Sequence, residues 1–387
     1  MKLLIVPMFA LSPMAGPWSR AQRIARAFIA AGHEVVLGMA ADGNCHDAAA
    51  PRTLELPVPS PLGAPMAIAK RTFPLAQKLG IAGRKPVHSF EEVLWLTGNL
   101  AYSFLARSVT AIRASIRSEG IDAVYSEFSL PAIIAAQAEG VAVFGTHSYP
   151  TQASYASDPT KAAGVRRLLQ ESGLPSVESA LELFERVHER FIPSCAELEP
   201  IEGEHVQFCG FLDAKPVEAG DAVERDVLVF YLGTGTVPQK TLVHTVQTVA
   251  AHTSLDVYLA GVDPAQAAQT VPGNLHVARR FDFSALLPRA VAFVNHGGQN
   301  SVMDALAYGA PQMVYPGKVF ERLYNAGSLE RAGAGVGLRE FTPDAIEAAL
   351  TQLANDSCRG NAARLRHELA SLGGAALIAR VCAENCR

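Results

Sequence analysis

The stretch FVNHGGQNSVMDALAYGAPQMVYP, residues 293–316, decides the fold and locates a candidate binding loop. A strand-like apolar run ends at His296 and a pair of glycines, and a helical pattern begins at Ser301. Glycines after a strand let backbone N–H groups approach an anion, because no Cβ stands in the way. The helix adds unsatisfied N–H groups and the positive end of its dipole, and His296 and Asn300 add further donors. The stretch therefore predicts a diphosphate pocket at a strand–helix junction.

The composition is typical of a globular α/β protein large enough for two domains. The chain has 387 residues, of which 49% are hydrophobic and 18% charged, and its net charge of −4 gives no reason to expect a nucleic-acid partner. It has no apolar run of about 18 residues, so we expect no transmembrane segment, and we interpret the N-terminal MKLLIVPMFA as a core strand rather than a signal peptide. The six cysteines lack zinc-ligand spacing, which favours reduced thiols, a cytoplasmic location and no metal.

Strand-like and helical patterns alternate through the first half of the chain. This βαβ rhythm predicts a parallel sheet with helices on both faces. The arginines of the first helical pattern are expected on its solvent side. The predicted strands are 3–9, 33–39, 122–125 and 141–145, the predicted helices are 19–31 and 131–139, and the arginines are Arg20, Arg23 and Arg26.

Two segments interrupt this rhythm, residues 57–118 and 148–176. The first is rich in Pro and Gly and then predicts one long helix from about Phe90 to Arg117. Insertions of this kind lie above the carboxyl ends of strands, where open α/β sheets bind ligands. A mildly basic segment is interpreted either as a solvated face or as a contact for an anionic or membrane-borne substrate. Its residues are Lys70, Arg71, Lys78, Arg84 and Lys85.

A second α/β unit follows a polar, irregular linker. We predict an N-terminal domain at 1–212, the linker at 213–225 and a C-terminal domain at 226–375. The last residues, 376–387, are predicted to form a helix that packs back toward the N-terminal domain. Two similar halves joined by a linker suggest two Rossmann-like domains with a cleft between them.

The segment LLPRAVAFVNHGGQNSVMDALAYGAPQMVYP, with NAGSLERAGAGVGL after it, resembles the donor-binding region of GT-B glycosyltransferases. The resemblance is to the enzymes that transfer sugars from UDP- or dTDP-sugars to natural products and other small molecules. It is dense over about 284–340 and looser elsewhere. It implies an α/β GT-B fold of two Rossmann-like domains, with the acceptor on the first and the nucleotide sugar on the second. It also implies no metal and no cofactor beyond the nucleotide sugar as co-substrate.

The resemblance assigns donor-binding roles along the second domain. His296 matches the histidine that contacts the diphosphate, and Asp304 stands where the family usually has Glu, facing the ribose hydroxyls. Phe281 to Phe283 match the segment that holds the base, and Thr234 matches the Ser/Thr loop opposite the phosphates. The full donor set is Thr234, Phe281, Phe283, His296, Gly297, Gly298, Asn300, Ser301, Asp304, Glu321 and Arg322.

One departure from the family pattern lies in the sugar pocket. Glu321 and Arg322 occupy positions where the family often has Asp-Gln or Glu-Gln. Glu321 keeps a carboxylate acceptor, whereas Arg322 replaces an amide with a cation. An arginine here would suit an anionic sugar or help neutralise the diphosphate, and a plain surface arginine is equally compatible with the sequence.

The second departure concerns the catalytic base. Many family members have a base histidine in the first loop, and Pro17 stands at that position here, between Gly16 and Trp18. The resemblance assigns these three residues to acceptor binding. Proline cannot accept a proton, so Glu127 and then His147, both at predicted strand ends, become the candidate bases, with His88 as a third. An acceptor with an acidic proton or a nucleophilic nitrogen would lessen the need for a base.

The sequence therefore predicts an inverting, metal-independent glycosyltransferase with a small, partly apolar acceptor. Three alternatives stay open: a glycosyltransferase-like binding or auxiliary protein without catalysis, an enzyme with a lipid-linked acceptor at a membrane surface, and an epimerase or hydrolase of nucleotide sugars. The expected partners are a UDP- or dTDP-sugar and the acceptor, with no nucleic acid and no integral membrane segment. A homodimer is also left open.

Overall fold

The computed structural model divides into two compact units, each described by itself. Unit 1 comprises Met1–Leu75, Val87–Ala214 and Leu372–Arg387, and unit 2 comprises Ala76–Pro86 and Lys215–Ser371. The structure describes all residues except 12–14, 41–44, 46–47, 51, 70, 72–85, 157, 214–223, 234–235, 267–271, 355 and 387.

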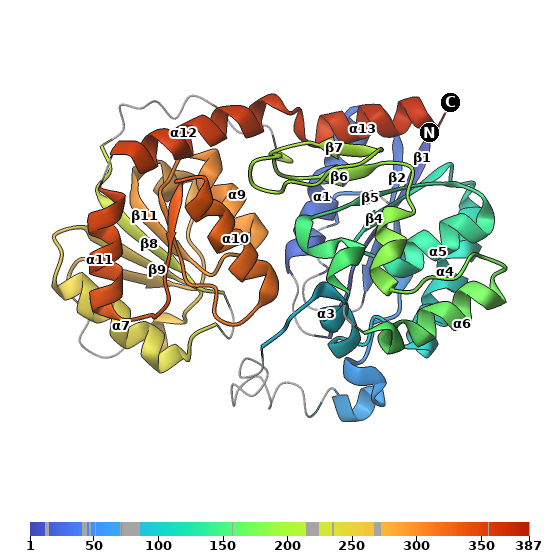
Figure 1. The fold of residues 1–387 in the computed structure, drawn as a ribbon, viewed down its shortest axis with the longest axis horizontal. Helices are drawn as coiled ribbons and strands as arrows, with labels where there is room; N and C mark the ends of the chain where they lie inside the picture. The colour runs from blue at the N-terminus through green and yellow to red at the C-terminus, as the bar shows by residue number, and fades with distance from the viewer. Residues whose placement is uncertain are drawn as a thin grey trace. The chain divides into compact units, whose positions relative to one another are not determined.

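Unit 1 is built on a seven-stranded sheet in the order β3-β2-β1-β4-β5-β6-β7, in which every paired neighbour is parallel (Figure 1). The chain builds one side of the sheet outward from β1 and then returns to build the other side from β4. The carboxyl ends of β1 and β4 therefore meet at a topological switch point, where such sheets bind ligands. The strands are β1 (Lys2–Pro7), β2 (Glu34–Ala40), β3 (Arg52–Leu56), β4 (Ala123–Glu127), β5 (Ala142–Thr146), β6 (Arg190–Ile192) and β7 (Val206–Phe208).

Helices cover both faces of this sheet, because successive side chains of a strand point to opposite faces. Leu3 and Ile5 of β1 pack on one face with Ile24 of α1, and Leu4 packs on the other face with Ile112 of α4. The C-terminal helix α13 lies beside α1 within unit 1 (Figure 1). The helices of unit 1 are α1 (Ala15–Ala30), α3 (Phe90–Leu96), α4 (Tyr102–Glu119), α5 (Leu130–Glu139), α6 (Ala163–Glu171) and α13 (Gly374–Asn385).

The long helix expected over residues 90–117 is wrong, because the structure forms α3 and α4 with a break between them. Gly98 lies in this break with φ +83°, and a Cβ there would come within 1.9 Å of the carbonyl oxygen of Ser60. The side-chain amide of Asn99 donates to the carbonyl of Phe9 at 3.0 Å, so the break is hydrogen-bonded to the segment after β1. A close backbone approach therefore interrupts a pattern that looks helical throughout.

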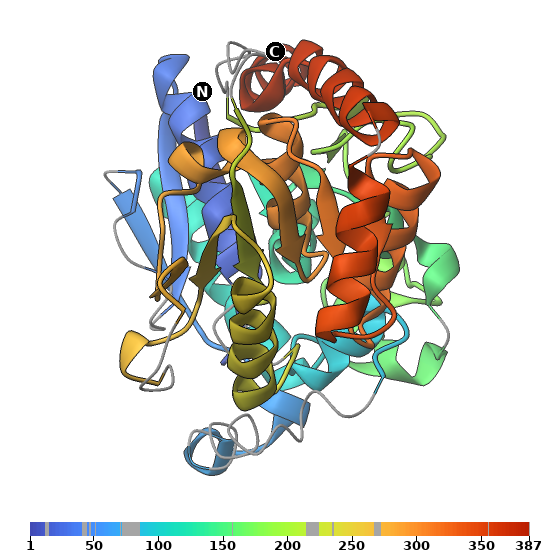
Figure 2. The same cartoon turned by 90° about the vertical axis from the view of Figure 1, so that its left-hand side faces the viewer.

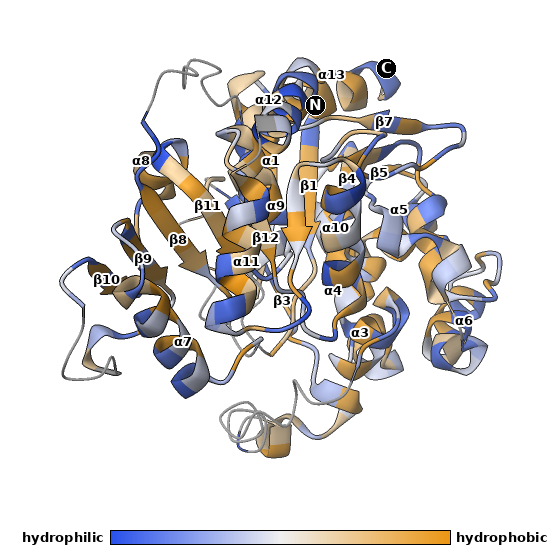
Figure 3. Ribbon diagram, turned by 60° about the vertical axis from the view of Figure 1, so that its left-hand side comes forward, coloured by the Kyte–Doolittle hydropathy of each residue, from blue (hydrophilic) through white to orange (hydrophobic). Residues whose placement is uncertain are grey.

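Unit 2 repeats the same topology with six parallel strands in the order β10-β9-β8-β11-β12-β13. Helices α7 and α11 cover one face of the sheet (Figure 2), and α8 and α9 pack on the other. Figure 3 shows the central strands as strongly hydrophobic, as burial on both faces requires. The elements are β8 (Val227–Tyr231), β9 (Asp256–Ala260), β10 (Leu275–Ala278), β11 (Ala290–Asn295), β12 (Gln312–Val314), β13 (Gly335–Gly337), α7 (Gln239–Ala251), α8 (Phe283–Leu286), α9 (Gln299–Ala307), α10 (Phe320–Arg331), α11 (Pro343–Leu353) and α12 (Asp356–Ser371).

These two sheets confirm the predicted α/β class with two Rossmann-like halves. None of the described helices has both the length and the apolarity needed to cross a membrane. The basic segment at 70–85 lies outside the described residues except for Arg71, which is exposed.

Candidate active site

The switch point of unit 2 lies between the carboxyl ends of β8 and β11, where Asn295 pairs in register with Tyr231. The loop that follows β11 contains His296 and leads directly into α9. Gly298 is the N-cap of α9, and as a glycine it makes no side-chain cap. The first N–H groups of this nine-residue helix lie at the switch point, where a helix N-terminus favours an anion.

Polar side chains fix the shape of this loop from beneath. The Asn295 side chain accepts a hydrogen bond from the N–H of Gly297 at 2.8 Å and donates to the amide oxygen of Gln312 at 3.0 Å. The Asn325 amide donates to the carbonyl of Gly297 at 2.8 Å. Since Asn295 and Gln312 are fully buried and neutral, they hold the loop without adding a charge near it.

Both glycines of the loop lie in confined space, and Gly297 also has a backbone conformation that favours glycine. Gly297 has φ +78°, and a Cβ there would come within 2.8 Å of Val314 Cγ1. A Cβ on Gly298 would come within 2.6 Å of Nε2 of His296. A side chain at either position would push into the histidine or the neighbouring strand, so the loop fits tightly around the imidazole.

His296 is largely buried and lies against Tyr231, with the two ring centroids 5.7 Å apart at 80°. Its Nδ1 atom is buried and has no hydrogen-bond partner in the structure. Burial, followed by the nearby charge of Arg322, lowers the pKa of His296 to about 4. The imidazole is therefore neutral at pH 7, with unused hydrogen-bonding capacity.

Arg322 lies in the first turn of α10 and extends toward the loop after β8. Its Nη1 donates to Oγ1 of Thr236 at 2.8 Å, and the Thr236 hydroxyl donates to the carbonyl of Leu232 at 2.7 Å. Burial lowers the pKa of Arg322 from its ordinary value, but an arginine remains charged at neutral pH. A cation, a neutral histidine and a helix N-terminus thus meet at one switch point.

The other predicted donor residues lie around this loop. Ser301 is buried and Asp304 is half-buried on α9, whereas Glu321 is exposed on α10. Phe281 packs against Tyr258 with the ring centroids 5.2 Å apart, and Phe283 packs against Tyr231 at 5.7 Å. Thr234 falls outside the described residues. The structure thus groups aromatic rings at the carboxyl ends of β8 and β9, one of the features expected of a nucleoside site.

The switch point of unit 1 is filled by a buried ion pair. Glu127, at the end of β4, has no exposed surface and accepts a hydrogen bond from Nε of Arg20 at 2.6 Å. The hydroxyl of Thr146 donates to its other oxygen. Burial raises the pKa of Glu127, and the charge of Arg20 and the Thr146 hydrogen bond oppose that shift. Both carboxylate oxygens are therefore engaged in a closed network.

The expected exposure of Arg20 is wrong, because this side chain is 7% exposed and its guanidinium carbon lies 5.3 Å from the ring centre of Phe128. The helical spacing contains the signal: Arg20 lies four residues before Ile24 and eight before Phe28, both fully buried. Arg23 is half-buried and Arg26 is exposed, as the solvent-side prediction requires.

His147 directly follows β5 and is also fully buried. Its Nδ1 lies 3.3 Å from the hydroxyl of Thr151, and its Nε2 is buried without a hydrogen-bond partner. Burial, and then the charge of Arg190, lower its pKa to about 3. The imidazole is therefore neutral at pH 7, and Nε2 is the buried atom with unused capacity.

The residues predicted to bind the acceptor lie at the start of α1. Gly16 is half-buried, Pro17 is buried, and Trp18 is 7% exposed within the core that also contains Ile24 and Tyr125. Trp18 is therefore a core residue, and the acceptor role of these three residues stays a prediction. His88 precedes α3 and is exposed.

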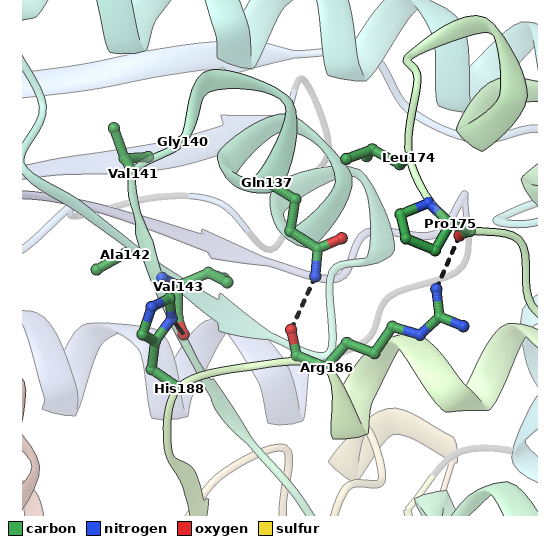
Figure 4. A pocket seen from close by; sticks show the side chains of 9 residues that line it. All are labelled: Gln137, Gly140, Val141, Ala142, Val143, Leu174, Pro175, Arg186 and His188. Carbon is green, nitrogen blue, oxygen red and sulfur yellow. Dashed lines mark hydrogen bonds between the residues drawn. The ribbon is translucent and has the colours of Figure 1, made fainter.

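A pocket of about 410 Å³ lies in unit 1, near the amino end of β5 (Figure 4). Its polar side chains are engaged with backbone atoms: the amide of Gln137 donates to the carbonyl of Arg186, and the Arg186 guanidinium donates to the carbonyl of Pro175, each at 2.8 Å. His188 contacts the backbone of Val143. Because this pocket lies at the sheet edge opposite the switch point, it has none of the features of the loop at His296.

Among the described residues, no group of three acidic, histidine or cysteine side chains could hold a metal ion.

Comparison with known proteins finds relatives of the segment that contains this site. Residues 245–384 match the family described as "Erythromycin biosynthesis protein CIII-like, C-terminal domain". Aclacinomycin-T 2-deoxy-L-fucose transferase of Streptomyces galilaeus is 34% identical over 107 residues, 27% of this chain and 24% of that protein. TDP-daunosamine transferase DnrS of Streptomyces peucetius is 34% identical over 104 residues, 26% of this chain and 24% of that protein. The matches therefore span about a quarter of the length of these curated relatives.

Solved structures resemble the whole chain. The glycotransferase of kitacinnamycin has a TM-score of 0.74 and 20% identity, covering 99% of this chain and 98% of that one. The glycosyltransferase VinC in complex with DTDP has a TM-score of 0.73 and 17% identity, covering 100% of this chain and 99% of that one. At this identity the likeness establishes the fold, which is the predicted GT-B fold.

Proposed function

We propose that the chain is a member of the EryCIII-like family of GT-B natural-product glycosyltransferases, and that it transfers a sugar from a nucleoside-diphosphate sugar to a small, partly apolar natural product. A dTDP-sugar is the preferred donor, with a UDP-sugar as the second choice. The name of a relative, TDP-daunosamine transferase, and the DTDP bound by VinC support this preference.

The observation that carries the proposal is the loop between β11 and α9. It combines two glycines at which a Cβ would clash with Val314 or with His296, the buried and unpartnered Nδ1 of His296, and the N-terminus of α9, whose N-cap is a glycine. Each of these features favours an anion, and none supplies a negative charge of its own. A diphosphate satisfies all of them together.

The reaction is written as a single displacement. An oxygen of the acceptor attacks the anomeric carbon, and the bond between that carbon and the β-phosphate oxygen breaks. The electron pair leaves with the nucleoside diphosphate, and the acceptor proton passes to a base or to solvent. The products are a glycoside of inverted configuration, a nucleoside diphosphate and a proton. No step in this scheme requires a metal, since the loop can stabilise the departing charge.

The base is a separate part of the proposal. Glu127 has both oxygens engaged, by Arg20 and Thr146, so it is better suited to positioning than to accepting a proton. His147 has an unused Nε2, so it is the preferred candidate on geometry, but its pKa of about 3 makes it a weak base at pH 7. Both side chains are fully buried, so an acceptor that ionises by itself would suit this site best.

The first test is thermal unfolding with dTDP, UDP, GDP and ADP in separate samples. A nucleotide at 100 times its dissociation constant should stabilise the protein by about 2.7 kcal/mol, which raises Tm by several degrees. A selective shift with dTDP or UDP, followed by release of that nucleotide from its sugar donor when an acceptor is added, is the expected result. No shift with any nucleotide would contradict the proposed donor site. Binding without turnover over a broad acceptor panel would favour a non-catalytic binding protein instead, and donor consumption without acceptor would favour a hydrolase or epimerase.

A further inference from the structure

Arg322 is a half-buried cation that forms no ion pair with any described carboxylate. Its hydrogen bond is to the neutral hydroxyl of Thr236 at 2.8 Å. The adjacent carboxylate, Glu321, is exposed to solvent on the first turn of α10. Removing a guanidinium from water is costly unless an anion or several acceptors replace the water. One hydroxyl uses one of its five N–H donors, so the group retains most of its capacity to bind an anion.

The surroundings of this guanidinium make its position more unfavourable in the absence of a ligand. The charge of Arg322 contributes to the low pKa of His296. The N-terminus of α9 adds a further positive potential to the same switch point. Three groups that attract anions therefore meet there, and the carboxylate of Glu321, whose charge acts on Arg322, is exposed to solvent.

Arg322 is held against the glycine loop itself. A Cβ on Gly297 would come within 3.0 Å of the backbone oxygen of Arg322 and 3.4 Å of its Cα. From this fixed base the side chain reaches Thr236, which belongs to the segment after β8. The guanidinium thus spans the two segments, after β8 and after β11, that border the switch point of unit 2.

We propose that Arg322 binds the diphosphate of the donor and stabilises the negative charge that it gains when the sugar leaves, with Thr236 as the residue that positions the guanidinium. This inference rests on the proposed function. The planar guanidinium can donate two parallel hydrogen bonds to phosphate oxygens, and it brings its charge without a metal ion. The sugar bond breaks with its electron pair on the β-phosphate oxygen, so a cation that contacts this oxygen acts most strongly in the transition state.

The test compares Arg322→Gln and Arg322→Lys with wild type, and uses Arg331→Gln as the matched control. Arg331 lies on the last turn of the same helix and is exposed. Calorimetric titration measures affinity for dTDP and for dTMP, and steady-state kinetics separate kcat from KM. We expect Arg322→Gln to weaken dTDP binding by about 10- to 100-fold and dTMP binding by much less, because dTMP lacks the β-phosphate. We also expect kcat of Arg322→Gln to fall. Arg322→Lys should recover part of the loss, and Arg331→Gln should match wild type.

Several results separate this inference from the proposed function. If wild type binds neither dTDP nor UDP, the proposed function fails. If wild type binds dTDP and Arg322→Gln binds it equally well, the role of Arg322 in diphosphate binding is wrong. An equal loss of dTDP and dTMP binding in Arg322→Gln would also overturn this role. The same holds if Arg322→Gln changes the preference between neutral and carboxylated sugars while its dTDP affinity stays constant. Thermal unfolding without nucleotide shows whether each variant is folded. Thr236→Val tests the positioning role of Thr236, and we expect it to lower kcat by less than Arg322→Gln does.

Discussion

The two switch points of this molecule have the same strand order and opposite chemistry. In unit 1 the last residue of β4 is Glu127, paired in register with Pro7, and in unit 2 the last residue of β11 is Asn295, paired in register with Tyr231. Glu127 is closed off by an ion pair with Arg20, whereas Asn295 is neutral and supports the glycine loop that contains His296. Equal topology therefore does not give equal chemistry.

The difference lies in the residues that immediately follow each strand. Phe128 adopts φ +61° and packs its ring in the core of unit 1, near the guanidinium of Arg20. Gly297 adopts φ +78° and is closely surrounded by Val314 and the backbone of Arg322. A bulky side chain packs at the first switch point, whereas the glycine at the second lets the loop pack tightly beside Arg322. The comparison predicts that changes at the first affect stability and changes at the second affect donor binding.

The largest expected effect is on the ion pair of unit 1. Arg20→Met leaves Glu127 buried without its cation, so we expect the free energy of unfolding to fall by about 3–5 kcal/mol. Urea denaturation checks this, with Arg26→Met as the control, because Arg26 is exposed on the same helix. The double variant Arg20→Met/Glu127→Met should recover most of the loss, because no unpaired charge remains. A stable Arg20→Met single variant would show that Glu127 is neutral or accessible to water, and would bring it back as a candidate base.

The next effect is on donor use in unit 2. His296→Ala removes a hydrogen-bond donor to the diphosphate. We therefore expect kcat/KM for the nucleotide sugar to fall by an amount that corresponds to a loss of about 2–4 kcal/mol in transition-state stabilisation. Stability should change much less, in contrast to Arg20→Met. The exposed histidine His252, replaced by Ala, serves as the control. Unchanged kinetics in His296→Ala would remove the histidine from the proposed donor site.

Much of this contrast can be predicted from the sequence, and the part that cannot depends on distant contacts. The His296 loop is readable because strand, glycines and helix follow one another in the chain, so local pattern and site coincide. Arg20 and Glu127 are separated by 107 residues, and only the fold brings them together. The break at Gly98 depends on the carbonyl of Ser60, another distant contact that no helical periodicity records.

The third prediction concerns acid stability. The folded pKa of His296, about 4, lies below the ordinary value of 6.5, so the unfolded chain binds more protons between these pH values. Stability should therefore fall as the pH drops from 6.5 toward 4, by up to about 3 kcal/mol for this group. His147 adds a loss of the same sign. Urea denaturation of His296→Asn between pH 4 and pH 7 should show a smaller slope than wild type, and His244→Asn, at an exposed position of α7, should not.

The smallest expected effect comes from giving unit 2 the kind of carboxylate that closes unit 1. Asn295→Asp keeps the acceptor for the N–H of Gly297 but loses the donor to the amide oxygen of Gln312. It also places a negative charge one residue from His296, where it should attract the imidazole proton and repel the diphosphate. We expect dTDP affinity to fall by about 1–2 kcal/mol and the pKa of His296 to rise. Calorimetry measures the first and NMR titration of the imidazole the second, with Asn295→Ser as the neutral control for the lost amide. If Asn295→Asp and Asn295→Ser weaken dTDP equally, charge does not distinguish the two switch points, and packing alone explains why one is closed and the other binds.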